Sequence, residues 1–253
     1  MSKQQSHQEW LAELELKSKK KQESFMNGIA SKLNRPRVLE KPAHPYRGAP
    51  DFWKEFTWTP EERMNQFTLN IEAAGGHVVH LSDMENVRQF ITSKAAEMSA
   101  SRIIRQNQEE LAWLNLESDL PNTEITVWSD TAETNLRSKA AEADFGIVVA
   151  DYAAAYTGSM VVTSSPTKGR SVSLLPTVLI AIIPVERLMT RLGEILVHFD
   201  GNENERLPAG IHFISGPSRS ADIENDLTIG VHAPGIVYAL IVDDFKPIPN
   251  LIK

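Results

Sequence analysis

Two segments in the second half of the chain hold residues whose types could bind an anion. The first spans residues 156–171 and combines hydroxyl side chains with two glycines and two cations, and the second spans residues 215–224 around Arg219. Glycine lets the backbone approach a ligand closely, hydroxyls donate to an oxyanion, and an arginine fork matches a carboxylate or phosphate. The expected anion site consists of Thr157, Gly158, Ser159, Lys168, Gly169, Arg170, Ser171, Gly216, Ser218, Arg219, Asp222, Glu224 and His232.

Several of these residues also fit a purely structural role. Residues 156–159 could form an ordinary turn between strands. Ser220 could cap a helix that begins there, with Asp222 in its first turn. Arg219 could bind an anion or bridge to a neighbouring acid, with neither favoured. For His232 a buried, hydrogen-bonded ring is favoured over a ligand contact.

Other kinds of site are disfavoured by the sequence. Residues 164–171 lack the first glycine of a Walker nucleotide loop, and Pro166 interrupts an S-x-x-K match in a predicted turn. His77 and His80 are three residues apart on a predicted strand, which sends their rings to opposite faces, so no shared metal is expected. Cysteine is absent, which removes disulfides, thiolate nucleophiles and the usual iron–sulfur ligation from this chain.

From residue 59 onward, alternating strand-like and helix-like patterns predict the elements that position these two segments. Thr59-Pro60 followed by two glutamates predicts a helix start, the apolar run 145–150 is typical of a strand buried on both faces, and the stripe over 185–199 predicts a helix. We therefore expect an α/β domain with a mostly parallel sheet flanked by helices. Both candidate loops follow predicted strands, so both could reach one site at one sheet edge. The strands are predicted at 77–81, 101–105, 124–128, 145–150, 159–163, 178–183, 211–214 and 236–242, with further helices at 84–97 and 131–143.

Residues 1–58 form a predicted N-terminal arm, and residues 59–253 form the predicted α/β domain. Apolar spacings over 10–14 and 25–33 predict two helices, and five prolines interleaved with aromatic residues over 36–60 predict an extended path. The formal charge is +5 over residues 1–50 and −12 over the remainder, within a net −7. A solvated helix face explains the basic residues most simply. Docking onto an acidic surface of a partner or a second copy is the alternative, and nucleic acid is disfavoured.

The overall composition predicts a cytoplasmic protein. Hydrophobic residues make up 42% and charged residues 23% of the chain, as in globular domains. No apolar run reaches the ~18 residues that a bilayer span requires, and the first residues lack the apolar region of a signal peptide.

The two candidate segments also resemble a family signature. Residues 150–159, 169–176, 216–224 and 230–234 follow, in order, patterns similar to A-D-Y-A-x-A-E-T-G-T, G-R-x-x-S-L-L-P, G-P-S-R-T-A-D-I-E and G-V-H-G-P of the LUD-domain family. The resemblance spans about residues 60–245 and is strongest to the family's lactate utilization branch. It implies a fold similar to the ribose-phosphate isomerase and CoA-transferase group. It also implies a role in bacterial L-lactate oxidation beside iron–sulfur oxidoreductase subunits.

Two positions depart from the family pattern, and two functions stay open. Tyr156 stands where the family usually has an acid, and Leu179 where it often has an aromatic residue or histidine. Because CoA-transferases of the related fold use a glutamate nucleophile, Tyr156 argues against a covalent acyl mechanism, and no catalytic residue is assigned. The first function is an accessory subunit that binds a small anion, with iron–sulfur clusters only in its partners. The second is an isomerase, transferase or ligase acting on a phosphorylated or carboxylated small molecule.

Overall fold

A computed structural model describes residues 3–37, 39–40, 56–129, 135–200, 207–221, 227–229 and 234–248. The chain divides into two units, an N-terminal unit (Met1–Phe52) and a main unit (Trp53–Lys253). The boundary predicted between residues 58 and 59 stays a prediction. Among the described residues, no helix combines the length and apolar character needed to cross a membrane.

The N-terminal unit contains one long helix, α1 (Lys3–Lys32). The sequence predicted two helices here, and that prediction is wrong. Residues 16–23 join the two apolar stretches without glycine or proline and are mostly lysine, glutamine and glutamate, which are strong helix formers, so the helix continues. Its large apolar side chains are exposed: Trp10, Leu11, Leu14, Leu16, Phe25, Met26, Ile29 and Leu33.

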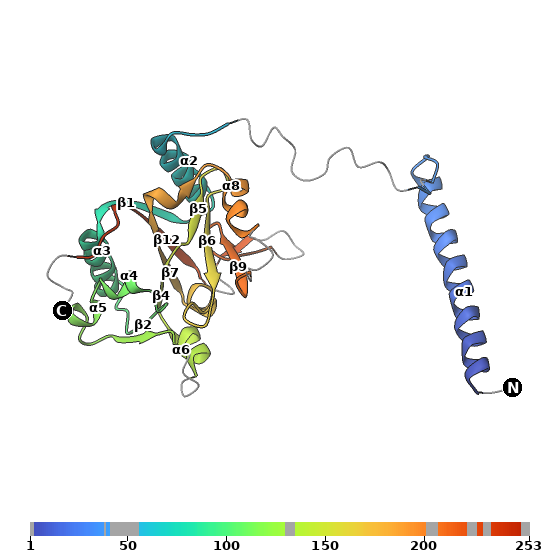
Figure 1. The fold of residues 1–253 in the computed structure, drawn as a ribbon, viewed down its shortest axis with the longest axis horizontal. Coiled ribbons are helices and arrows are strands. Elements are labelled where there is room, and N and C mark those ends of the chain that lie inside the picture. The colour runs from blue at the N-terminus through green and yellow to red at the C-terminus, as the bar shows by residue number, and fades with distance from the viewer. Residues whose placement is uncertain are drawn as a thin grey trace. The chain divides into compact units, whose positions relative to one another are not determined.

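The main unit is built on a six-stranded parallel sheet, which confirms the predicted fold class (Figure 1). From one edge to the other it contains β1 (His77–Asp83), β12 (Ile236–Asp244), β7 (Val178–Pro184), β4 (Phe145–Val149), β2 (Arg102–Arg105) and β3 (Glu124–Val127). Every residue of the two central strands, β4 and β7, is buried. Strands covered on both faces must be apolar throughout, which explains the uninterrupted apolar runs in the sequence.

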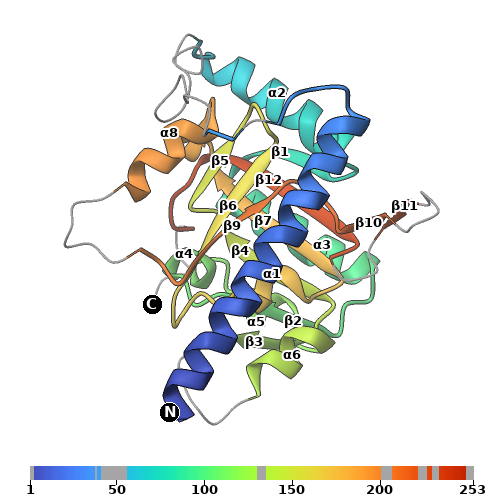
Figure 2. The same ribbon diagram turned by 90° about the vertical axis from the view of Figure 1, so that its right-hand side faces the viewer.

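Helices and a second sheet cover the two faces of this sheet (Figure 2). One face packs against α3 (Met84–Glu97), α4 (Glu109–Ala112) and α5 (Leu116–Asp119). The other packs against α2 (Pro60–Ala73), α6 (Leu136–Glu142), α7 (Ser171–Leu174) and the second sheet. The candidate loops connect elements of this second layer, so its topology decides where they lie.

The second sheet has four strands in the order β8 (Leu188–Met189), β5 (Tyr152–Ala154), β6 (Ser159–Ser164) and β9 (Gly210–Ile214). Strand β6 pairs antiparallel with both β5 and β9. The strands predicted at 159–163 and 211–214 therefore belong to this second sheet and not to the parallel sheet, so their predicted place in the parallel sheet is wrong. Apolar character identified them as strands, but it did not reveal which sheet they join.

The helix predicted over residues 185–199 is also absent as a continuous element. The segment divides into a 3₁₀ turn (Val185–Arg187), strand β8, helix α8 (Leu192–Leu196) and a second 3₁₀ turn (Val197–Phe199). The backbone of β8 pairs with β5, so tertiary pairing overrides the local helical periodicity.

The helix expected to begin at Ser220 is replaced by a strand. Residues Arg219–Ala221 form β10, which pairs antiparallel with β11 (Leu227–Ile229). Residues 222–226 between the two strands lie outside the described residues. Ser220 lies inside β10, so it does not form the helix cap that the sequence allowed at this position.

Helices α2 and α3 follow their predicted starts because both carry strong N-terminal caps. The Thr59 hydroxyl accepts from the Glu62 N–H, and the Glu62 carboxylate accepts from the Thr59 N–H, which completes a capping box. The Asp83 carboxylate accepts from the Asn86 N–H at 2.9 Å and caps α3. This backbone hydrogen bond holds the pKa of Asp83 below its usual value.

The Asp83 cap can be tested by substitution. We expect Asp83→Ala to lower the free energy of unfolding by about 1 kcal/mol, because the N-terminal N–H groups of α3 lose their acceptor. Asp83→Asn keeps an oxygen acceptor and should lose less. Urea unfolding at pH 7 measures both, and equal losses in the two variants would show that the charge rather than the hydrogen bond matters.

Candidate functional site

The expected site residues separate into two groups at opposite ends of strand β6. Thr157, Gly158 and Ser159 lie at its beginning, whereas residues 168–171 follow its end at Ser164. Five steps of about 3.3 Å separate Ser159 from Ser164, so the two groups lie roughly 16 Å apart along the strand. The prediction that all these loops meet at one edge is therefore wrong.

The first group forms a turn against the C-terminal end of α2. Gly158 has φ +58°, and the Ser159 hydroxyl lies 2.8 Å from the Thr157 hydroxyl and 2.7 Å from that of Ser215. The Asn70 amide donates to the Ala155 carbonyl at 2.8 Å and holds the turn on the helix. This arrangement matches the strand-linking turn that the sequence also allowed.

The second candidate loop lies at the same end of α2. Gly216 has φ +128° and packs against Ala74, and the Ser218 N–H donates to the Pro234 carbonyl at 2.9 Å. Arg219 Nη2 donates to the Ala73 carbonyl at 3.4 Å, which places a cation at the negative end of the helix dipole. The structure therefore gives Arg219 a helix-end contact. The remaining predicted residues, Asp222, Glu224 and His232, lie outside the described residues.

Lys168, in the loop that follows β6, forms an ion pair with Asp151. Its ammonium lies 2.5 Å from Asp151 Oδ1 and 3.3 Å from the Thr163 hydroxyl. The other oxygen of Asp151 accepts from the Thr163 N–H at 2.7 Å and from its hydroxyl at 2.8 Å. Both charged side chains are largely buried, so Lys168 serves to hold the loop in place.

Arg170, by contrast, lines a cavity of about 730 Å³, which we call the arginine cavity. Its lining includes a second guanidinium, Arg137 from α6, together with serine hydroxyls, and none of the lining residues that the structure describes is acidic. Within the described residues neither arginine forms an ion pair. The lining consists of Trp128, Ser129, Arg137, Ser164, Ser165, Pro166, Gly169, Arg170, Ser171, Leu174, Leu175 and Ala209.

Two close contacts shape the wall of the arginine cavity. A Cβ added at Gly169 would overlap the indole ring of Trp128, so only glycine lets the loop lie on this ring. The pairing of β6 with β9 brings Ser164 and His212 together, with 2.9 Å between Ser164 Oγ and His212 Nε2. Burial and the neighbouring Arg170 guanidinium lower the pKa of His212, so the ring stays neutral near pH 7.

The sequence identified only part of this cavity. Gly169, Arg170 and Ser171 were expected, whereas the lining residues Trp128, Arg137 and Ser164, and His212 that contacts Ser164, were not. Arg137 and Trp128 carry no local motif, and His212 becomes relevant only through the pairing of β9 with β6. These residues could be identified only through contacts between distant segments, and a single sequence does not show such contacts.

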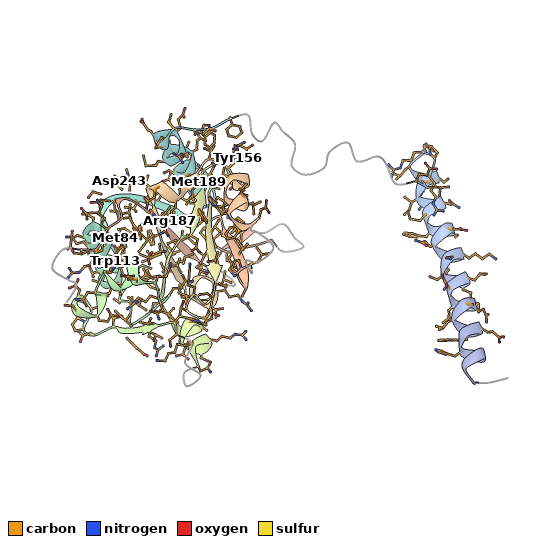
Figure 3. All side chains as sticks on the ribbon, in the orientation of Figure 1. Met84, Trp113, Tyr156, Arg187, Met189 and Asp243 are labelled. Carbon is orange, nitrogen blue, oxygen red and sulfur yellow. The ribbon has the colours of Figure 1, made fainter. Side chains whose placement is uncertain are left out.

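A second cavity, of about 460 Å³, lies where strand β4 ends. It is lined by Gln108, Glu110, Asp151, Tyr152, Lys168 and Arg187, the last of which is labelled in Figure 3. Its charges are paired: Lys168 with Asp151, and Arg187 Nη2 with Glu110 at 3.7 Å. An anion would have to compete with these acids, so the arginine cavity is the better anion site. No cluster of three or more metal-ligating side chains occurs among the residues searched, which are the described ones.

The two departures from the family pattern have structural explanations. Tyr156 packs with Phe56 and Trp58, with ring centroids 5.6 and 6.1 Å away, and it lies near Met189 in Figure 3. Leu179 is buried in strand β7 between β4 and β12. Neither residue lines the arginine cavity.

Comparisons with known proteins agree with this architecture. The LUD domain model matches residues 64–242. Lactate utilization protein C from Halalkalibacterium halodurans is 37% identical over 88% of this chain and 98% of its own length, and the protein of that name from Bacillus subtilis is 30% identical over 88% and 96%. A crystal structure of a DUF162 family protein from Deinococcus radiodurans superposes with a TM-score of 0.54 at 18% identity, covering 73% of this chain and 99% of that one.

The influence of Arg170 on His212 provides a test of the cavity's electrostatics. We expect Arg170→Gln to raise the pKa of His212 toward about 6.5, because a nearby cation no longer disfavours protonation. The imidazole resonances, followed by NMR against pH, measure this shift. An unchanged pKa would show that burial alone sets it.

The same substitution should change the pH dependence of stability. In the wild type the pKa of His212 is lower in the folded chain than in the unfolded chain, so the unfolded chain binds more protons as the pH drops below about 6.5, and the free energy of unfolding falls. In Arg170→Gln the two pKa values lie closer together, and this loss should be smaller.

Proposed function

Because the chain belongs to the LUD domain family, we propose that it acts in bacterial lactate utilisation as an accessory component that holds a small carboxylate and carries no redox centre. The observation that carries this proposal is the presence of Arg137 and Arg170 in one cavity, with no acid among its described lining residues. Two guanidiniums that have no carboxylate partner in the described part of the chain favour an anionic ligand, and their planar forks suit carboxylates.

The electron-transfer step is assigned to other subunits in this proposal. The sequence contains no cysteine, so it cannot hold an iron–sulfur cluster by the usual ligation. We expect the clusters in iron–sulfur oxidoreductase subunits that assemble with this chain in the cytoplasm. The chain's own contribution is then to bind an acid and to dock onto these partners.

Helix α1 is the proposed docking element. It exposes a row of apolar side chains and carries the basic run Lys17–Lys21 near its centre. Two such helices paired side by side, in either direction, would bring these central basic runs together. An acidic partner surface with apolar pockets is therefore a better match than a second α1.

An enzyme of the isomerase, transferase or ligase type is the second candidate. The cavity beside Lys168 and Asp151 favours it, because this ion pair lies at the C-terminal edge of the parallel sheet, where α/β enzymes bind substrates. Turnover of a phosphorylated or carboxylated substrate that is lost in Asp151→Asn, but retained in Arg170→Gln, would favour this function over the first.

Anion binding can be measured by thermal shift. At about 100 times its dissociation constant, lactate or phosphate should stabilise the wild type by roughly 2.7 kcal/mol. We expect Arg137→Gln and Arg170→Gln to lose most of this gain. Arg219→Ala serves as the matched control and should retain it, because Arg219 contacts the end of α2. Loss of the gain in Arg219→Ala alone would place the site at the other end of β6.

Deletion of residues 1–52 tests the docking element. The shortened chain keeps Phe56, Trp58 and the rest of the described main unit, so its unfolding midpoint should be little changed. Its capture of the iron–sulfur subunits, or its mass in light scattering if it pairs with itself, should fall. Unchanged capture together with unchanged mass would exclude α1 as a docking element.

The proposed division of labour predicts that the isolated chain is inactive in electron transfer. The purified protein should show no flavin or iron–sulfur absorbance and should not reduce a dye when lactate is added. Lactate-dependent dye reduction by the chain alone would contradict the accessory role.

A further inference from the structure

A hydrogen-bonded pair, Ser164 and His212, stands at the edge of the arginine cavity. Ser164 is the last residue of β6 and lies opposite Gly210 on β9, while His212 is two residues further along β9. The imidazole leans back over Gly210, so that Nε2 lies 2.9 Å from the Ser164 hydroxyl. A Cβ at Gly210 would come within 2.7 Å of Nε2, so the glycine provides the space that the ring occupies.

This contact orients the hydroxyl of Ser164, which is a residue of the cavity lining. Ser164 lines the cavity together with Arg137 and Arg170. A hydroxyl can donate one hydrogen bond and accept two, so Ser164 keeps capacity for a ligand after bonding to the imidazole. A neutral imidazole allows either direction of this hydrogen bond. When Nε2 accepts the serine proton, the serine oxygen is free to accept a hydrogen bond from the ligand. When Nε2 carries the proton and donates it, the serine O–H is free to donate to the ligand.

We propose that the Ser164–His212 pair recognises the oxygen on carbon 2 of an acid whose carboxylate is held by Arg137 and Arg170. The inference rests on the proposed function and adds a substrate class to it: 2-hydroxy and 2-oxo acids. Lactate and pyruvate are the three-carbon members of this class. A serine hydroxyl can accept from the hydroxyl of the first and donate to the carbonyl of the second.

The rest of the cavity extends this class to larger acids. Its apolar lining is formed by Trp128, Pro166, Leu174 and Leu175. A volume of about 730 Å³ leaves space beside these side chains once a three-carbon acid is bound. The cavity should therefore also accept 2-hydroxy acids with a branched apolar side chain, such as 2-hydroxy-4-methylpentanoate.

Isothermal titration calorimetry with L-lactate, pyruvate, 2-hydroxy-4-methylpentanoate and propanoate tests the proposal on the full chain. Propanoate has the same carboxylate but no oxygen on carbon 2. We expect the wild type to bind the three oxygenated acids at least about tenfold more tightly than propanoate, the size of effect that one hydrogen bond to the ligand gives. In Ser164→Ala this preference should fall to within about twofold, and Ser165→Ala, which changes another lining serine, should keep it.

His212→Gln provides a second variant that acts through the orientation of Ser164, and it should weaken the preference while propanoate affinity stays unchanged. Equal wild-type affinities for lactate and propanoate would overturn the inference and leave the anion cavity intact. Preference that survives in Ser164→Ala would also overturn it. Absence of binding by all four acids would overturn the proposed function itself, so the two failures are distinguishable.

Discussion

The ion pair between Asp151 and Lys168 determines how the loop after β6 is placed. Asp151 follows the central strand β4, and its two oxygens bind the Lys168 ammonium and both donors of Thr163. These contacts tie the end of the main sheet to the end of β6, and a backbone hydrogen bond from Asn107 to Thr167 ties the same loop to β2. Because Lys168 is held in this ion pair, Arg170 is the cation of this loop that lines the arginine cavity.

The distribution of paired and unpaired charges then distinguishes the possible sites. Lys168, Arg187 and Arg219 each contact an acid or a carbonyl within the protein. Arg137 and Arg170 have no such partner among the described residues, and the His212 ring beside them stays neutral. A bound acid would supply the missing negative charge without displacing an existing contact, so ligand binding requires no ion pair to break.

The sequence predicted those elements whose signals are local. Capping residues located the start of α2, and continuous apolar runs located the buried strands β4 and β7. The second sheet was not predicted, because β5 and β8 contain only three and two residues and exist through pairing. The main error in the site has a related cause: residues 157–159 were treated as the loop after the strand at 145–150, whereas they form the turn from β5 into β6, and the two ends of one strand lie at opposite edges of a sheet. Arg170 was identified by its type, whereas Arg137 and His212 depend on contacts between distant segments.

A crystal structure of the chain with bound L-lactate tests the central claim most directly. We predict that the carboxylate lies between the guanidiniums of Arg137 and Arg170, with the lactate hydroxyl within hydrogen-bond distance of Ser164 Oγ. Lactate bound instead beside Lys168 and Arg187, with the arginine cavity empty, would contradict it.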